Sequence, residues 1–169
     1  MKIMNEAVKA ANKLIRTHEE RNPEKLARRL GIWIKSTPFK EQKGVYTIIN
    51  RQPIIFVKDD ITSAMRSMVI AHELGHHMLH RGELKKRAKF QEHNIFYADN
   101  NHMEYEANLF AAQLMLPDDE ILEYLYQGYS VSQIARAMRS NVNLVALKIS
   151  ELNSRGYKFR EQEVRNNFY

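Results

Sequence analysis

Hydrophobic positions recur along this chain with a helical period at both ends and with a strand-like pattern between them. Residues 4–20 carry their apolar side chains on one stripe, which predicts an amphipathic helix. A second, short helix is expected over 22–31, where Asn22 and Pro23 provide a start signal and Gly31 a stop signal. The first part of the chain is therefore expected to be helical.

Residues 32–58 differ, because they contain three short runs rich in β-branched and aromatic side chains. The runs are 32–34, 44–50 and 53–58. Arg51 and Gln52 separate the last two runs, which predicts a hairpin and a small antiparallel sheet. Pro53 has no amide proton to donate, so it belongs at the start of a strand or at a sheet edge. We expect the third run to form such an edge.

The helical period then returns. Three helices are expected, over 62–80, 103–116 and 118–128. Gly82 and Pro117 follow the first two and act as stop signals. Residues 81–102 are polar and irregular, and we expect a loop there.

The C-terminal part of the pattern predicts two more helices within 130–155, separated by a polar turn. Ser130 and Gln133 have the spacing of a capping box at the start of the first. The expected division is a domain over 1–127 and a C-terminal helical segment over 128–169 that packs on it. The fold class is α+β, mostly helical, with a small sheet.

Composition narrows the chemistry that this fold can carry. The chain has 169 residues, a formal net charge of +6 and no cysteine. Disulfides and thiolate metal sites are therefore excluded, and any metal ion must be bound by His, Asp or Glu.

The N-terminal stretch is charged and amphipathic rather than apolar, so it does not read as a signal peptide. No stretch approaches the roughly 20 apolar residues of a membrane span. We expect a soluble cytoplasmic protein with no membrane partner.

The stretch "VIAHELGHHMLH" at 69–80 places imidazoles and a carboxylate in an apolar helix. His72 and His76 are four residues apart and share a face, so both can bind one metal ion. Glu73 is rotated away from them and can reach a water molecule at that ion as a general base. Gly75 allows another segment to approach closely. This H-E-x-x-H arrangement predicts a zinc site of the metalloprotease type, in which Glu73 is catalytic.

A catalytic zinc ion needs a third protein ligand. The helix from Met103 offers Glu104 and Glu106, and we expect Glu104 to be the ligand because small residues share its face and let the two helices press together. Asn108, one turn further on, can orient a ligand histidine from behind. Glu106 falls on another face and is expected to be an exposed carboxylate.

Other polar side chains near the motif are less specific. His77 and His80 are expected to pack or cap, and His80 suits the C-terminus of its helix. The strand edge at 53–58 can pair with an extended substrate backbone. Candidate donors for stabilising an oxyanion are His93, Tyr97, His102 and Tyr105, among which the sequence does not choose.

Two segments together, "VIAHELGHHMLH" and "EYEANLFAAQLMLP", resemble the paired signature of the ImmA/IrrE metallopeptidases. "PEKLARRLGI" is similar to the beginning of that family. The resemblance spans about residues 60–118. It implies a zincin-like fold with one Zn²⁺ per chain, bound by His72, His76 and Glu104, and with Glu73 catalytic.

The same resemblance implies a biological role. Such enzymes cut a helix-turn-helix repressor or regulator, so the implied partner is a protein substrate and the implied role is that of an anti-repressor in a mobile element or a stress response. One position departs from related gluzincins, which carry Asp where this chain has Asn108. That departure weakens the orienting role predicted for this side chain.

An alternative function comes from the C-terminal segment, whose two helices have the layout of a helix-turn-helix. Residues 130–155 contain four basic side chains against one acid, and Asn143 and Lys148 are the best candidates for reading bases. A DNA- or protein-binding regulator with a structural metal site is therefore the competing hypothesis. The second helix is largely apolar, however, which favours packing over nucleic-acid contact.

Overall fold

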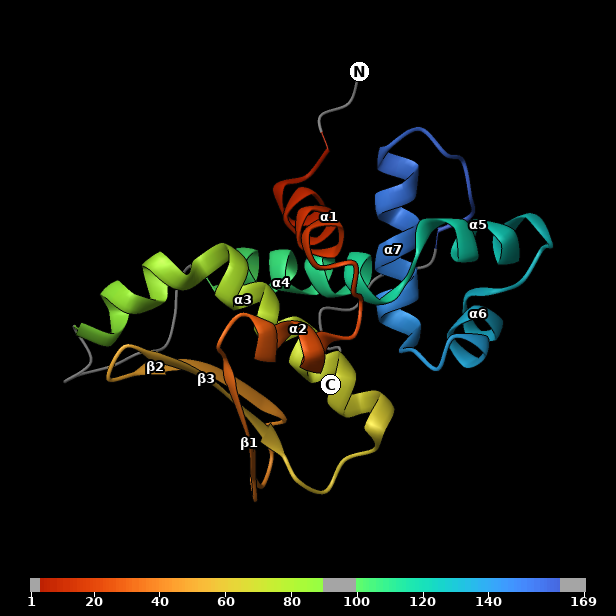
Figure 1. Ribbon diagram of the computed structural model, residues 1–169. Coiled ribbons are helices and arrows are strands. Elements are labelled where there is room, and N and C mark those ends of the chain that lie inside the picture. The colour runs from red at the N-terminus through yellow and green to blue at the C-terminus, as the bar shows by residue number, and fades with distance from the viewer. Residues whose placement is uncertain (1–3, 90–99, 162–169) are drawn as a thin grey trace.

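A computed structural model describes residues 4–89 and 100–161, and in these ranges the chain forms seven helices and one small sheet (Figure 1). The helices are α1 Glu6–His18, α2 Pro23–Arg29, α3 Ser63–Lys89, α4 Asn100–Met115, α5 Asp118–Tyr126, α6 Val131–Ala137 and α7 Val142–Ser154. The strands are β1 Trp33–Thr37, β2 Gly44–Ile49 and β3 Gln52–Lys58. The expectation of a mostly helical α+β fold is confirmed.

The long helix α3 lies at the centre, between the sheet and the remaining helices (Figure 1). It packs on β2 and β3 on one side and on α4 on the other. Helix α1 covers α3 and α4, and α7 packs on the far part of α4. Leu74 of α3 and Phe110 of α4 are fully buried, so the contact between these two helices forms the middle of the core. None of the helices in the described ranges is long and apolar enough to cross a membrane.

Local capping follows the sequence signals. The side chain of Asn5 accepts a hydrogen bond from the backbone at the start of α1, and Asn22 does the same for α2. Ser130 and Gln133 form both hydrogen bonds of the predicted capping box at the start of α6. The starts of α2 and α6 were therefore predictable from short-range chemistry alone.

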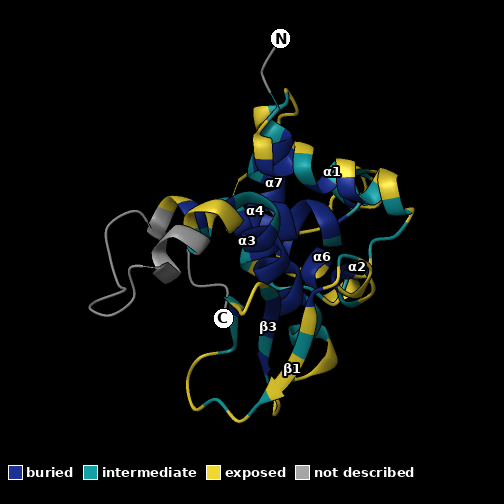
Figure 2. Ribbon diagram, turned by 60° about the vertical axis from the view of Figure 1, so that its left-hand side comes forward, coloured by how far each residue is buried: buried dark blue, intermediate teal, exposed yellow. Residues whose placement is uncertain are grey.

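The sheet corrects two expectations. Its strand order is β1-β3-β2, so β3 is the central strand and the predicted edge at 53–58 is wrong. The sheet is also mixed, because β1 pairs with β3 in parallel while β2 pairs with it antiparallel. Pro53 is tolerated because the ladder with β1 begins only at Ile54, so no partner needs the missing amide proton. Strand β1 is the outer strand on that side and is largely exposed (Figure 2).

The predicted hairpin is confirmed, with its turn one residue earlier than expected. Ile49 pairs with Gln52, so the two turn residues are Asn50 and Arg51. Both have positive φ angles, 49° and 67°, as a tight two-residue hairpin requires.

Helix α3 is longer than its stop signal predicted. It continues through Gly82 to Lys89, and α4 already begins at Asn100. The loop expected over 81–102 is therefore wrong at both of its ends, and 90–99 lie outside the described residues. A glycine in a helix costs only about 1 kcal/mol relative to alanine, which the rest of a helix of this length offsets.

Candidate metal centre

The middle of α3 carries the predicted motif in a nearly dry environment. His72, Glu73 and His76 are 3%, 6% and 8% exposed. The neighbouring Val69 and Ile70 are fully buried, which anchors this turn of the helix in the core. Polar side chains in such a place need partners, because an unpaired buried polar group costs free energy.

Helix α4 brings Glu104 to both histidines. His72 Nε2 is 3.0 Å from Oε2 of Glu104, and His76 Nε2 is 3.3 Å from its Oε1. The two Nε2 atoms are 3.1 Å apart. All three candidate ligand atoms lie within 4.8 Å of one another, and no other such group of His, Asp or Glu was found in the described part of the chain. The structure thus brings together the three side chains that the sequence singled out.

The close contact of α3 and α4 depends on Gly75. A Cβ atom at this position would lie 3.0 Å from Cα and 3.1 Å from O of Ala107. Any side chain there would push α4 away and carry Glu104 with it. The sequence analysis explained Gly75 by the close approach of another segment, and α4 is that segment.

Electrostatics within the group favour a charged carboxylate at Glu104 and raise the pKa of His72. Burial acts to raise the pKa of Glu104, but hydrogen bonds and charge from His72 and His76 lower it far below the usual range. Burial acts to lower the pKa of His72, and the carboxylates of Glu104 and Glu73 raise it. Two imidazole nitrogens beside a carboxylate are a donor set that suits zinc and related divalent ions.

Asn108 lies behind His72, where the sequence placed it. Its Oδ1 is 2.6 Å from Nδ1 of His72, and both side chains are buried. With the proton on Nδ1, His72 donates to this oxygen and turns Nε2 toward Glu104. An asparagine oxygen accepts such a bond as a carboxylate does, so the departure from Asp leaves the contact intact.

Glu73 lies where α3 meets β2. Its carboxylate accepts a hydrogen bond from the backbone N–H of Tyr46, and burial raises its pKa. Gly44 makes this possible, because a Cβ there would lie 2.4 Å from Cγ1 of Val69 and 2.8 Å from Oε1 of Glu73. The strand therefore lies directly against the carboxylate, a contact that the sequence analysis did not foresee.

Two predictions about nearby side chains were wrong. Glu106 is not a free surface carboxylate, since its Oε2 is 2.9 Å from Nε2 of His80. His80 does not lie at a helix end, because α3 continues past it, and it is only 3% exposed. Burial lowers its pKa, and the hydrogen bond to Glu106 opposes that shift. His77 packs as expected, with its Nδ1 2.8 Å from the hydroxyl of Tyr46.

The candidate oxyanion donors remain unassigned. His93 and Tyr97 lie outside the described residues. His102 is largely exposed, with its Nε2 3.3 Å from Oε1 of Glu106, and Tyr105 is 40% exposed on α4.

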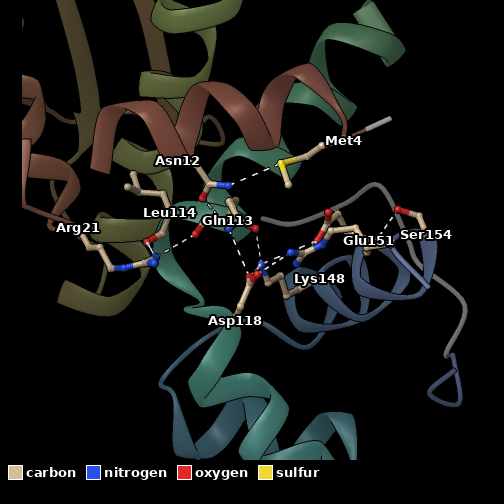
Figure 3. A network of polar contacts seen from close by, with 10 residues as sticks. Met4, Asn12, Arg21, Gln113, Leu114, Asp118, Lys148, Glu151 and Ser154 are labelled. Atoms are coloured by element: carbon tan, nitrogen blue, oxygen red, sulfur yellow. Dashed lines mark hydrogen bonds and ion pairs between the residues drawn. The ribbon is translucent and has the colours of Figure 1, made fainter. Parts of the chain in front are cut away.

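The best base-reading candidate of the C-terminal segment, Lys148, is buried and lies in a network of polar contacts (Figure 3). Lys148 is 0% exposed, and its ammonium group contacts Asp118 at 2.5 Å and the amide of Gln113. Arg155, a second basic residue of this segment, bonds Asp118 at 2.6 Å. Asn143, the other base-reading candidate, is half-buried at the start of α7. A fully buried lysine cannot reach the edge of a base, so Lys148 cannot contribute to the DNA-binding surface predicted for this segment.

Comparisons with known proteins give a matching family model and similar proteins. A family model described as Peptidase_M78, IrrE N-terminal-like domain, matches residues 27–150. The chain is 31% identical to "Uncharacterized immunity region protein 2" of Bacillus phage phi105, over 85% of this chain and 89% of that protein. It is 28% identical to "Metallopeptidase ImmA" of Bacillus subtilis (strain 168), over 89% of this chain and 88% of that protein.

Proposed function

Because the chain belongs to the IrrE N-terminal-like peptidase family, we propose that it is a zinc-dependent endopeptidase of the H-E-x-x-H class. The observation that carries this proposal is the convergence of His72, His76 and Glu104 within 4.8 Å. One Zn²⁺ per chain, bound by these three side chains, would polarise a scissile carbonyl and lower the pKa of a water molecule. Three protein ligands are the number that catalytic zinc sites use, with the fourth position left for water or substrate.

Glu73 is the general base in this proposal. A water molecule that attacks a peptide carbonyl must lose a proton. Glu73 can take this proton, because it directly follows the candidate ligand His72 in the sequence and is not itself one of the three candidate ligands. The same carboxyl group then gives the proton to the leaving amine. Its raised pKa suits this exchange, because a group that both accepts and returns a proton works best near the operating pH.

The substrate is proposed to be a peptide in extended conformation. Strand β2 takes over the role expected of 53–58, because it is an outer strand of the sheet and lies against α3 at Glu73. A strand edge offers backbone groups with which an extended peptide can pair. Pairing there would hold the scissile bond beside the catalytic carboxylate.

The proposed cellular substrate is a helix-turn-helix repressor, cut in the cytoplasm, which makes the protein an anti-repressor. The names of its relatives support this, since one is called an immunity region protein and the other a metallopeptidase. We keep the division into a peptidase domain, 1–127, and a C-terminal helical segment, 128–169, as part of this proposal. The alternative is a DNA- or protein-binding regulator with a structural metal ion.

Replacing Glu73 by Gln tests the proposed chemistry most directly. The amide keeps the shape of the side chain but cannot take a proton, so cleavage of a co-expressed repressor should fall by about 10²- to 10⁴-fold. Zinc content, measured by elemental analysis, should stay at one ion per chain. His72→Ala is the matched variant that should lose both zinc and cleavage. Undiminished cleavage by the Glu73→Gln protein would refute the assignment of the base.

A further inference from the structure

A polar chain lies behind His76, at the ring nitrogen that does not face Glu104. Nδ1 of His76 is 3.1 Å from Nδ1 of His80, and Nε2 of His80 is 2.9 Å from Oε2 of Glu106. His80 is 3% exposed, and the side chain of Glu106 is 21% exposed. One imidazole and one carboxylate thus connect the candidate ligand His76 with the other face of α4.

Counting protons shows that the hydrogen bonds from His76 through His80 to Glu106 can run in only one direction. If His76 binds an ion through Nε2, its proton is on Nδ1 and it must donate. Nδ1 of His80 must then be the acceptor, which puts the proton of His80 on Nε2. That nitrogen in turn donates to the carboxylate of Glu106. Every group in the chain has its partner when both imidazoles are neutral and Glu106 is charged.

We propose that His80 and Glu106 are positioning residues that hold His76 in the tautomer and orientation needed to bind the metal ion. This inference rests on the proposed zinc site. It makes the two histidine ligands differ in their support, because His72 donates directly to an amide oxygen of Asn108 while His76 is backed by an imidazole and a carboxylate in series. Neither support touches the ion itself.

The proposed support of His76 explains why His80 and Glu106 lie where they do. A histidine and a glutamate are expensive to bury unless they are paired, and here both are placed on the two helices that build the metal centre. Partners of this kind behind a metal ligand fix its ring and raise its basicity, and losing them typically weakens metal binding by about 10- to 100-fold.

Zinc affinity measured against a chromophoric chelator tests the proposal in the whole chain, without any peptidase assay. His80→Ala removes the acceptor and should weaken zinc binding by about 10-fold or more. His80→Asn should recover most of that loss, because its amide oxygen can take the place of Nδ1 and copies the support that His72 already has. Glu106→Gln keeps an oxygen for His80 but removes the charge, so its loss should be smaller than that of His80→Ala.

His102→Ala is the matched control. His102 also contacts Glu106, at 3.3 Å, but from the exposed side, and it lies at the far end of the chain from His76. Zinc affinity should be unchanged in this variant. If His102→Ala lost as much zinc affinity as His80→Ala, any change beside Glu106 would weaken zinc binding. The proposed support of His76 through His80 and Glu106 in series would then be refuted.

A second measurement needs no variant and therefore cannot fail through misfolding. Long-range ¹H–¹⁵N spectra of the zinc-loaded wild-type protein should show His80 protonated on Nε2 and His76 protonated on Nδ1. His80 protonated on Nδ1 would overturn the proposal, because that nitrogen could not accept from His76.

The outcomes separate this inference from the proposed function. If the wild-type chain binds zinc, His72→Ala abolishes binding and His80→Ala does not change it, the positioning role is wrong while the zinc site stands. If the wild-type chain binds no zinc at all, both proposals fall together.

Discussion

Helix α4 carries a polar cluster at each of its ends, and the two are built on opposite principles. In its first half, Glu104 meets two histidines of α3, so that three groups with lone pairs face one another. Near its last turn, Gln113 meets Lys148 of α7 together with Asp118, so that opposite charges face one another. One cluster groups three possible ligands of a metal ion, whereas the other already contains its own cation, the ammonium group of Lys148.

This difference separates a candidate binding site from a structural joint, by which we mean the cluster of Gln113, Lys148 and Asp118. Arg155 extends the second cluster by bonding Asp118 and Glu151, and Asn12 of α1 bonds the amide of Gln113, so the network ties α1 and α7 to α4 and α5 (Figure 3). Its charges satisfy one another and leave nothing to bind a ligand. The histidine cluster instead offers three possible metal ligands, and for this reason we propose a function for it and a role in stability for the joint.

The largest expected effect on stability comes from breaking the joint. Asp118→Ala leaves the ammonium group of Lys148 buried, with Glu151 at 4.0 Å as its remaining carboxylate. Removing one partner of a buried ion pair typically costs about 3 to 5 kcal/mol, and we expect the lower end because the side chain of Asp118 is 33% exposed. The free energy of unfolding from urea titration measures this. The double variant Asp118→Asn with Lys148→Met should recover much of the loss, and equal losses in both would contradict the pairing.

The same carboxylate has a defined dependence on pH. Burial acts to raise the pKa of Asp118, but hydrogen bonds from Arg155 and Lys148 lower it well below its ordinary value of 3.8. A lowered folded-state pKa stabilises the fold above the unfolded value and loses that contribution as the pH falls through the folded one. The stability difference between wild type and Asp118→Ala should therefore be constant from about pH 5 to 8 and shrink below about pH 4.

A smaller effect is expected from filling the other cluster. Zinc at about 100 times its dissociation constant should raise the free energy of unfolding by about 2.7 kcal/mol, because it binds only the folded chain. Thermal unfolding with and without zinc measures this shift. Lys148→Met should lower the stability but keep the same zinc-dependent gain, whereas Glu104→Gln should lose the gain. A zinc effect that depended on Lys148 would erase the distinction between joint and site.

The histidine cluster was predictable from the sequence because its rules are local. A spacing of four residues puts His72 and His76 on one face of a helix, and small neighbours of Glu104 indicate which face of the next helix presses against them. Gly75 completes that reasoning, since only a glycine admits the backbone of Ala107. Each inference needed only one helical period and one contact between helices.

Three of the features that were missed depend on partners far away in the chain. Pro53 was read as an edge signal, although the parallel pairing that decides the question begins one residue later, with Trp33 opposite Ile54. Glu106 was judged by the face of its own helix, while its partner His80 lies 26 positions earlier. Lys148 was counted as a surface cation because nothing nearby in sequence reveals Asp118, 30 positions away.

The smallest expected effect, none at all, tests whether the C-terminal segment binds DNA. Of its four basic residues, Lys148 and Arg155 are committed to the joint, which leaves Arg136 and Arg139 on the surface. A protein that contacts several phosphates loses affinity steeply between about 50 and 200 mM salt. Fluorescence anisotropy with a labelled duplex should show no such dependence, and Arg139→Ala should leave the signal unchanged. Salt-sensitive binding that weakens in Arg139→Ala would return the regulator hypothesis, and α7 would then have to serve both as a packed core helix and as the frame of a DNA-binding surface.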